Sequence, residues 1–455
     1  MAIDDRIQQA LAYADTTKHI AFGHHVTGQA GALFAQSFPG KRAILVADTN
    51  TWNACGPDVQ ASFEAAGISM DNPYIFPGSP TLYASYENVD ILRGILRATD
   101  AICCSIAAGT LNDLAKLASY ELERPYMNVC TAASVDGFAA FGASIAKDGF
   151  KITRTCDAPV ALVADVDVMA QAPQRLTATG YGDLIEKIPA GADWILSEEL
   201  GIEAIDTRVW ELVQGPLRQA LANPDAIASG DPDALVGLAE GNLMSGLAMQ
   251  AYQSSRPASG AGHQFSHTWE MEGHGLDEEP PLSHGFKVGI GTIASCALWE
   301  YALSLDLTTI DIDALVATAP TRAQVEEQVR ALHIPAIQDA AVSQTMDKFV
   351  DGEALRERLE RIVARWPNIV ERCQAQLISP EEVMAALRAV GAPSHPIMIG
   401  IDLARLKQTY FQAYSIRSRY TILDLLNNVQ YLGNAVDALF GPDGFWGRHL
   451  DPLAS

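Results

Sequence analysis

Short apolar runs alternate with helical stretches over the first part of the chain. Each run is short, apolar and partly β-branched, as buried strands are. The predicted strands cover residues 41–48, 74–77, 100–107 and 126–131. Helical stretches follow the first three, to about Ala66, to about Thr99 and over L-N-D-L-A-K-L-A-S-Y. Strands that alternate with helices at this spacing predict a parallel sheet of the doubly wound kind.

Beyond about residue 180 the pattern changes to long amphipathic stretches. The three clearest ones cover residues 206–221, 353–366 and 380–391. Before the last of them Ser379 is a helix N-cap, and Gly391 is a stop signal. We therefore divide the chain into an α/β part, residues 1–180, and an all-helical part, residues 181–455. In the second part, the acidic segment 277–281 is the clearest loop.

The composition is that of a soluble globular protein. The chain has 455 residues, of which 48% are hydrophobic and 19% charged, and no apolar run is long enough to span a bilayer. The first ten residues lack the basic start and apolar run of a signal peptide, so we expect a cytoplasmic protein. Seven cysteines without a C-x-x-C pair indicate reduced, mostly buried thiols and argue against a thiolate metal site.

The charge balance limits the possible partners. The chain has 55 Asp and Glu against 31 Lys and Arg, which gives a formal net charge of −24. Such a charge repels nucleic acid and anionic membranes. An anionic substrate would therefore have to be captured by a local group of donors.

Candidate binding residues follow three of the predicted strands, at the edge where ligands bind in open parallel sheets. Asp48 ends the first strand and could bind a ribose, although helix capping explains a carboxylate there at least as well. The turn S-I-A-A-G-T-L-N-D-L-A-K holds Gly109, where backbone N–H groups could approach a phosphate; a tight structural turn is the alternative. Thr131, Ser134 and Asp136 follow a later strand, and an ordinary capped turn would also explain them.

Four of the ten histidines fall within 22 residues and form a candidate metal site. His263 and His267 are four residues apart, which places both on one face of a helix. Spacing nominates both as ligands of zinc, nickel or iron, with His284 nearby; a polar surface pair is the alternative. Asp183 is typical of a helix N-cap, and it becomes a candidate for the site only if the histidines need a carboxylate partner. Other histidines are interpreted as surface residues: His24, His25 and His274.

Seven segments spread over nearly the whole chain carry a family resemblance. They are V-A-D-T-N-T, G-T-L-N-D-L-A-K, T-A-A-S-V-D-G, G-Y-G-D-L, G-H-Q-F-S-H, H-G-F-K-V-G-I-G-T and I-R-S-R-Y-T-I-L-D. In this order they resemble the sn-glycerol-1-phosphate dehydrogenases, most closely the bacterial branch found with arabinose-utilisation genes. That family belongs to the superfamily of iron-containing alcohol dehydrogenases, glycerol dehydrogenase and dehydroquinate synthase. The resemblance implies a Rossmann-like dinucleotide-binding domain over residues 1–180 and an all-helical metal- and substrate-binding domain over residues 181–455.

The resemblance also implies roles for individual residues. Asp183, His263 and His284 would bind one divalent metal, zinc or nickel, and Asp183 would touch the substrate as well. His267 would be a catalytic residue on the substrate side and not a ligand, and Asp136 would contact the substrate. Residues that would line the NAD or NADP cofactor are Asp48, Gly109, Thr110, Asp113, Thr131 and Ser134.

The implied activity is the interconversion of dihydroxyacetone phosphate and sn-glycerol 1-phosphate. Hydride would pass between the cofactor and C2, with the metal as Lewis acid and His267 as proton relay. Candidate donors to the phosphate group are Lys287, Arg417 and Arg419. Alternatives are a dehydrogenase for another polyol or polyol phosphate, an elimination like that of dehydroquinate synthase, or a cofactor-binding relative with weak or no turnover. A homodimer is expected, because helical domains of this superfamily commonly pair subunits.

Three departures from the family pattern concern the cofactor. Ala107 and Ala108 stand where glycines are usual, so two methyl groups would press on the pyrophosphate. Ala140 replaces a serine that often contacts the cofactor, and Phe286 replaces an acid after His-Gly. Together they put cofactor affinity in question more than metal binding.

Overall fold

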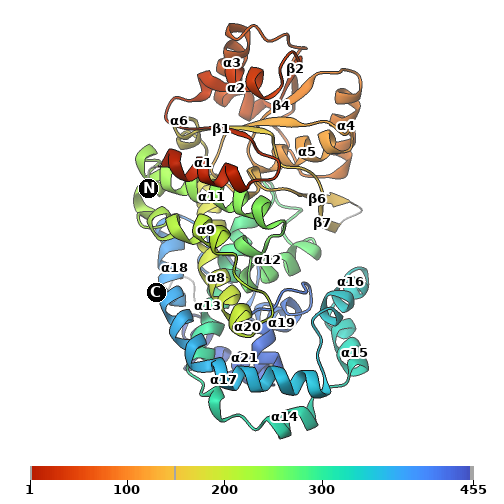
Figure 1. Ribbon diagram of the computed structural model, residues 1–455, viewed down its shortest axis with the longest axis vertical. Helices are drawn as coiled ribbons and strands as arrows, with labels where there is room; N and C mark the ends of the chain where they lie inside the picture. Colours follow the sequence, from red (N-terminus) through yellow and green to blue (C-terminus); the bar gives the residue numbers. More distant parts are fainter. Residues whose placement is uncertain (1–2, 148–149, 451–455) are drawn as a thin grey trace.

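The molecule is elongated, with an α/β part at one end and a helical part at the other (Figure 1). The computed structural model describes residues 3–147 and 150–450. Every strand of the described chain lies before residue 166, and the rest is helical apart from connecting segments. The predicted architecture of an α/β part followed by a helical part is therefore confirmed. The predicted boundary at residue 180 falls inside helix α7 (Gln174–Ile185) and stays a prediction.

Six parallel strands form the main sheet in the order β1-β8-β5-β4-β2-β3. They are β1 (His19–Gly23), β2 (Ala43–Asp48), β3 (Tyr74–Phe76), β4 (Ile102–Ala107), β5 (Tyr126–Cys130) and β8 (Ala161–Asp165). The four strands predicted from the sequence are β2 to β5, whereas β1 and β8 are not among the predicted strands. β2 pairs with β3 on one side and β4 on the other, so the chain changes direction across the sheet there. In such folds nucleotides bind at the carboxyl ends of the strands beside this switch point.

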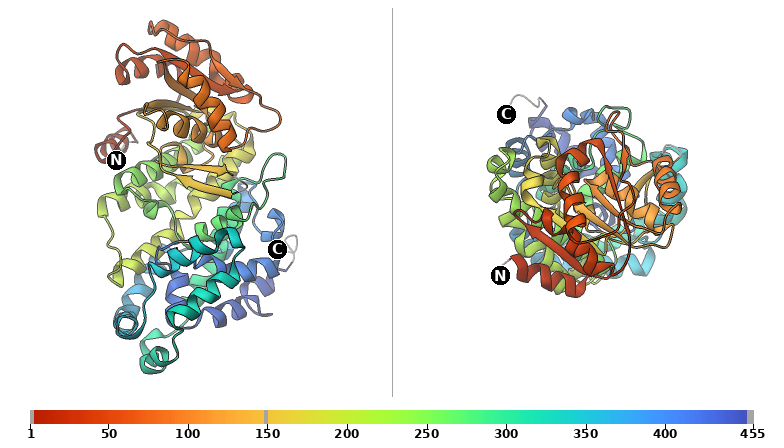
Figure 2. Two further views of the ribbon diagram at one scale, coloured as in Figure 1. Left: turned by 90° about the vertical axis from the view of Figure 1, so that its right-hand side faces the viewer. Right: turned by 90° about the horizontal axis from the view of Figure 1, so that it is seen from above.

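Helices cover both faces of the sheet. This is required because successive side chains of β2 point to opposite faces and are apolar on both. Ile44 and Val46 pack in the layer under α4 and α5, whereas Leu45 and Ala47 pack under α2 and α3. These helices are α2 (Ala30–Ser37), α3 (Thr49–Ala65), α4 (Tyr86–Arg97) and α5 (Gly109–Tyr120). An antiparallel hairpin, β6 (Ala143–Lys147) with β7 (Phe150–Arg154), lies between the sheet and the helical part (Figure 2).

Two long buried helices, α11 (Pro232–Tyr252) and α13 (His284–Leu303), form the centre of the helical part. Most residues of both helices are buried, so neither has a single apolar face, and α13 contacts α7, α12 and α18. Helix α1 (Ile3–Tyr13) packs against α11, so the start of the chain belongs to this core. The other helices are α6 (Val166–Ala170), α8 (Lys187–Glu199), α9 (Thr207–Ala220), α10 (Pro224–Ala228), α12 (Ala261–Met271), α14 (Ile312–Thr318), α15 (Arg322–Leu332), α16 (Pro335–Met346), α17 (Gly352–Gln376), α18 (Pro380–Ala389), α19 (Leu403–Ala413), α20 (Ile422–Asn428), α21 (Leu432–Phe440) and α22 (Phe445–Arg448).

Several local predictions are confirmed. Ser379 caps α18 in a reciprocal pair with Glu382, and Gly391 follows the helix with a φ of +74°. The acidic segment 277–281 lies outside helices and strands, and the seven cysteines are free and buried. None of the helices in the described part of the chain has the length and apolar character needed to cross a membrane.

Candidate metal and substrate site

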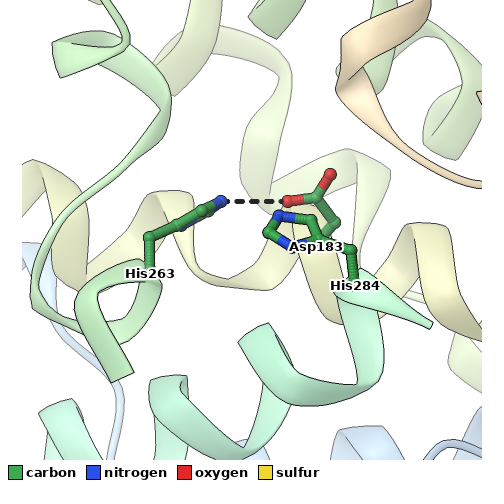
Figure 3. Close-up of side chains that lie close together, drawn as sticks. All are labelled: Asp183, His263 and His284. Atoms are coloured by element: carbon green, nitrogen blue, oxygen red, sulfur yellow. Dashed lines mark ion pairs between the residues drawn. The ribbon is translucent and has the colours of Figure 1, made fainter. Parts of the chain in front are cut away.

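Three helices bring together the residues expected to bind a metal. Asp183 comes from α7, His263 from α12 and His284 from the first position of α13. One donor atom of each lies within 4.8 Å of the other two, and the side chains point toward one another (Figure 3). Asp183 Oδ1 and His263 Nε2 are 3.3 Å apart. Asp183 lies inside α7, so the alternative interpretation of it as a helix N-cap is wrong.

Glycines allow these helices to approach closely. A methyl group at Gly285 would lie 1.9 Å from the carbonyl oxygen of Thr179 in α7. A methyl group at Gly291 would lie 2.1 Å from the carbonyl oxygen of Gly262 in α12. Backbone therefore touches backbone where α13 crosses α7 and α12. Because Gly285 and Gly262 are direct neighbours of the two histidines, this packing sets the distances between the three donor side chains.

A carboxylate lies behind each of the two imidazoles. His263 Nδ1 and Glu186 Oε2 are 2.8 Å apart, an ion pair without the alignment of a hydrogen bond. His284 Nδ1 is 3.0 Å from Glu270 Oε1, in a hydrogen bond. A carboxylate at Nδ1 favours the proton on that nitrogen and leaves Nε2 for a metal. Burial disfavours the charged form of His263, but Glu186 and Asp183 outweigh it and raise its pKa to about 9.

Lys187 joins the carboxylates of Asp136 and Asp183 and, like Glu186 and Glu270, is a site residue that sequence reasoning missed. Its Nζ lies 2.9 Å from both Asp136 Oδ2 and Asp183 Oδ1, and it also donates to the backbone oxygen of Asp183. Burial disfavours its charge, but the two aspartates raise its pKa above the usual value. Burial also opposes the charge of Asp183, whose pKa Lys187 and His263 nevertheless hold well below its usual range. The spacing of four residues between Asp183 and Lys187 is the signal that could have found this contact.

Six buried charged groups gather around the donor atoms, and their balance favours a divalent cation. They are Asp136, Asp183, Glu186 and Glu270, with Lys187 and Lys287. With His263 in the neutral form that binds a metal, four carboxylates against two ammonium groups leave an excess of two negative charges in a site with little access to water. Because uncompensated buried charge is costly, an ion with two positive charges would complete the cluster. The donor set and the charge therefore fit the metal that the sequence predicts.

His267 lies one helical turn beyond His263 on the same helix. Its ring is 5.9 Å from that of His263 and 5.6 Å from that of His284, measured between centroids. Its Nδ1 is 3.3 Å from Glu270 Oε2, so Nε2 is the nitrogen left to meet a substrate. Burial lowers the pKa of His267 to about 3, against the opposing effect of Glu270. His267 thus lies next to the three donor side chains but does not belong to the group whose donor atoms are all within 4.8 Å of one another.

His274 is less peripheral than the sequence suggested. Its side chain is half-buried, and Nε2 lies 2.6 Å from the backbone oxygen of Ile399, to which it donates. Its own backbone oxygen accepts a hydrogen bond from Lys287 at 3.2 Å. The interpretation of His274 as a surface residue is therefore wrong, while His24 and His25 are exposed as expected.

Asp136 connects the α/β part to the helical site. It lies on the loop that follows β5, and its backbone N–H donates to Asp183 Oδ2 at 3.1 Å. Ser245 of α11 donates to Asp136 Oδ2 at 2.8 Å, beside the ammonium group of Lys187. The other oxygen, Oδ1, has no hydrogen-bond partner among the described residues. It is the oxygen that remains for a substrate hydroxyl.

The residues expected to bind the cofactor lie at the carboxyl edge of the sheet. Gly109 and Thr110 begin α5 directly after β4, and the buried Thr131 and Ser134 follow β5. β4 and β5 are neighbours in the sheet, so the four residues share one edge. This placement fits a dinucleotide, and their roles in binding it stay predictions.

Two aspartates expected at the cofactor also have structural partners. Asp48 Oδ1 accepts hydrogen bonds from the backbone N–H groups of Asn50 and Thr51, both at 2.8 Å, so helix capping accounts for this oxygen. Asp48 Oδ2 has no hydrogen-bond partner in the described part of the chain. Asp113 Oδ2 accepts from the backbone N–H of Ser144 at 3.2 Å, which ties α5 to β6.

The expectation that two alanine methyl groups press on the pyrophosphate is wrong for one of them. Ala107 is fully buried, and its side chain packs in the apolar layer under α4 and α5. Ala108 is the half-buried N-cap of α5, with φ −83° and ψ −169°, an extended conformation that any residue adopts. Only the methyl of Ala108 is therefore placed where it could meet a nucleotide.

Known proteins resemble this chain in sequence and in fold. The family described as iron-containing alcohol dehydrogenase matches residues 21–173. Glycerol-1-phosphate dehydrogenase (NAD(P)+) of Bacillus velezensis is 36% identical over 386 residues, which is 84% of each chain. The enzyme of the same name from Halalkalibacterium halodurans is 37% identical over 258 residues, 56% of this chain and 64% of that one. A probable glycerol dehydrogenase from Sinorhizobium meliloti has a similar fold, with a TM-score of 0.57 at 16% identity over 92% of this chain and 97% of that one.

Proposed function

Because the chain belongs to the glycerol-1-phosphate dehydrogenase family, we propose that it is a metal-dependent, NAD(P)-linked dehydrogenase. Its reaction would interconvert dihydroxyacetone phosphate and sn-glycerol 1-phosphate. The observation that carries the proposal is the buried meeting of Asp183, His263 and His284, hydrogen-bonded to the loop of Asp136. This arrangement sets a cation site beside the sheet edge at which a cofactor would bind.

We propose that Asp183, His263 and His284 hold one divalent ion, zinc or nickel. One carboxylate with two imidazoles suits these ions and leaves coordination positions for a substrate. The bound ion would supply Lewis-acid polarisation of the substrate oxygen at C2. The excess of two negative charges among the buried groups supports a divalent ion.

The protein's own side chains would orient the substrate and move a proton. Asp136 Oδ1 is placed to accept a hydrogen bond from a substrate hydroxyl, while Lys187 and Ser245 hold the other oxygen. His267 would exchange a proton with the substrate oxygen through Nε2, because its Nδ1 faces Glu270. Such a positioned acid–base group typically contributes about 10²- to 10⁴-fold to the rate.

The cofactor would be NAD or NADP, bound along the carboxyl edge of the sheet. Asp48 Oδ2 is available for the adenosine ribose, and a carboxylate there disfavours the 2′-phosphate of NADP, so NAD is the better fit. The other proposed contacts are Gly109, Thr110, Asp113, Thr131 and Ser134.

We expect metal-stripped protein reloaded with zinc or nickel to oxidise sn-glycerol 1-phosphate with NAD or NADP. Turnover is measured as NAD(P)H absorbance, across a panel of glycerol, other polyols and their phosphates, and chelation should abolish it. Faster oxidation of another polyol or polyol phosphate would replace the proposed substrate. Consumption of substrate without net cofactor reduction would indicate an elimination. NAD binding without turnover of any substrate would indicate a binding protein.

Replacing Glu186 by Gln should weaken metal binding by roughly 10- to 100-fold, and so should Glu270→Gln. Each change leaves the three donor side chains in place but removes the charge that orients an imidazole through Nδ1. The metal dissociation constant is measured by competition with a chelator. Glu240→Gln is the matched control, because this buried carboxylate pairs with Arg6 and not with a histidine. Wild-type metal affinity in both site variants would contradict the proposed role.

Two further expectations complete the proposal. We propose that the enzyme is a homodimer, as expected for helical domains of this superfamily, and that it works in the cytoplasm. Size-exclusion chromatography with light scattering tests the first, and cell fractionation tests the second.

A further inference from the structure

The segment between α19 and α20 presents a cation without a partner. Arg417 is exposed and has no hydrogen-bond or ion-pair partner among the described residues. Its segment nevertheless lies close to the site, because Arg419, two residues further on, donates to Ser259, which precedes the helix of His263 and His267. The charge of Glu270, a carboxylate of the site, also opposes the lowering of the Arg417 pKa by desolvation. A guanidinium next to the buried charged groups of the site, with uncommitted hydrogen-bond donors, is suited to an anionic ligand.

The chain directly after Arg417 is held by other contacts. The backbone N–H of Ser418 donates to Gln344 Oε1 at 2.8 Å. Arg419 donates to the backbone oxygen and the hydroxyl of Ser259, at 2.6 and 2.8 Å, and to Ser255 Oγ at 2.9 Å. Because Ser259 directly precedes the N-cap of α12, these bonds tie the Arg417 segment to the helix that carries His263 and His267. These contacts hold the backbone next to Arg417, so less order has to be gained there when its side chain binds a ligand.

The other two candidate phosphate donors have structural partners. Lys287 Nζ donates to the backbone oxygen of His274 at 3.2 Å and pairs with Glu270 at 3.6 Å, so it balances charge inside the buried cluster. Arg419 is occupied by the two serines, and burial with the neighbouring Arg256 and Arg417 lowers its pKa to about 9. Of the three cations, Arg417 is the one whose guanidinium donors are uncommitted.

We propose that Arg417 binds the phosphate group of the substrate, an inference that rests on the proposed function. A guanidinium presents paired N–H donors that match two phosphate oxygens. A phosphate bound there would lie on the His267 and Glu270 side of the site. The residue would thus distinguish a polyol phosphate from the free polyol.

We expect Arg417→Met to raise the KM for sn-glycerol 1-phosphate by roughly 10- to 100-fold, with a much smaller change in kcat, because a charge-assisted contact is lost. The ratio of kcat/KM for glycerol 1-phosphate to that for glycerol should fall by a similar factor. Arg417→Lys, which keeps the charge but not the paired donors, should recover part of the loss. Metal content and KM for NAD should match those of the wild type in both variants.

Arg97→Met is the matched control. Arg97 is an exposed arginine in the last turn of α4, near the edge of the sheet away from the carboxyl ends, and no partner is described for it. Arg97→Met changes the net charge by the same amount as Arg417→Met. A comparable rise in KM in Arg97→Met would therefore show that the arginines act only by long-range attraction of the substrate. An unchanged KM in Arg417→Met would overturn the inference.

Calorimetry with inorganic phosphate separates this inference from the proposed function. Metal-loaded wild-type protein should bind phosphate at least tenfold more tightly than Arg417→Met. If the wild type fails to oxidise glycerol 1-phosphate, the proposed function fails, and the phosphate titration still decides the role of Arg417. Equal phosphate binding by both proteins would refute that role even if the enzyme is active.

Discussion

The His263→Ala variant should lose both the bound metal and the activity, whereas His267→Ala should keep the metal and turn over slowly. His263 Nε2 lies 3.3 Å from Asp183 Oδ1 within the group of three donor side chains, and His267 lies outside that group. Removing one of three donors also removes the Lewis acid, which corresponds to a loss of roughly a thousandfold or more in rate. Removing a proton relay should cost about 10²- to 10⁴-fold at wild-type metal content.

Metal content per chain, measured by atomic emission after equal loading, separates the two variants. Glycerol 1-phosphate oxidation is then compared at full metal occupancy. The two residues are matched, since they share a helix, a side-chain type and a helical face. Equal loss of metal in both variants would refute the assignment of different roles. Full metal binding by His263→Ala would refute the proposed ligand set.

Gly285→Ala should destabilise the protein and also weaken metal binding, although position 285 offers no donor atom. The added methyl would lie 1.9 Å from the backbone oxygen of Thr179, so α13 and α7 would have to separate. Overpacking of this kind typically costs about 1–3 kcal/mol, and a backbone oxygen cannot rotate away as a side chain can. Because His284 adjoins the contact and Asp183 lies on the following turn of α7, the two donors would move apart.

Thermal unfolding and chelator competition measure the two effects of the Gly285→Ala change. Gly94→Ala is the control, because position 94 is in the exposed interior of α4 and a methyl there would meet no atom within 4 Å. That change should leave metal binding unaltered and stabilise the protein by about 0.5–1 kcal/mol, since alanine favours the helix. A wild-type melting temperature and metal affinity in Gly285→Ala would show that the close approach does not set the site.

The sequence pattern alone predicted most of the elements whose formation depends on residues close together in the chain. The apolar runs that became β2 to β5, the amphipathic stretches of α9, α17 and α18, and the Ser379 cap depend on neighbours in sequence. Length does not explain why β1 (His19–Gly23) and β8 (Ala161–Asp165) were missed, because β5 is equally short and was predicted. β1 is an edge strand in which only Ala21 is buried, whereas β8 is fully buried and did carry a local signal. Among the described strands β1 pairs only with β8, far away in the sequence, so the tertiary pairing defines β1 more than its own residues do.

Glu186, Glu270 and Lys187 show why the surroundings of the site could not be predicted. Charged residues on helices are usually solvated, and nothing in E-K at 186–187 distinguishes them from surface groups. They are buried because α12 packs against both the start of α8 and α13, so that Glu186 meets His263, Glu270 meets His284 and the lysine meets two aspartates. Only the spacing from Asp183 to Lys187 carried a local signal.

The sequence by itself determined the order of strands and helices, the helix on which His263 and His267 share a face, and the family resemblance. These follow from periodicity and motifs, which are local properties of the chain. The spacing of the two histidines left open which of them meets Asp183 and His284; the resemblance implied His263, and the tertiary structure brings these three side chains together. Only the tertiary structure decided that Ala107 faces the core and that Arg417 is left without a partner among the described residues. The reason is that such contacts depend on how glycine-lined helices from distant segments cross, and no local pattern specifies that crossing.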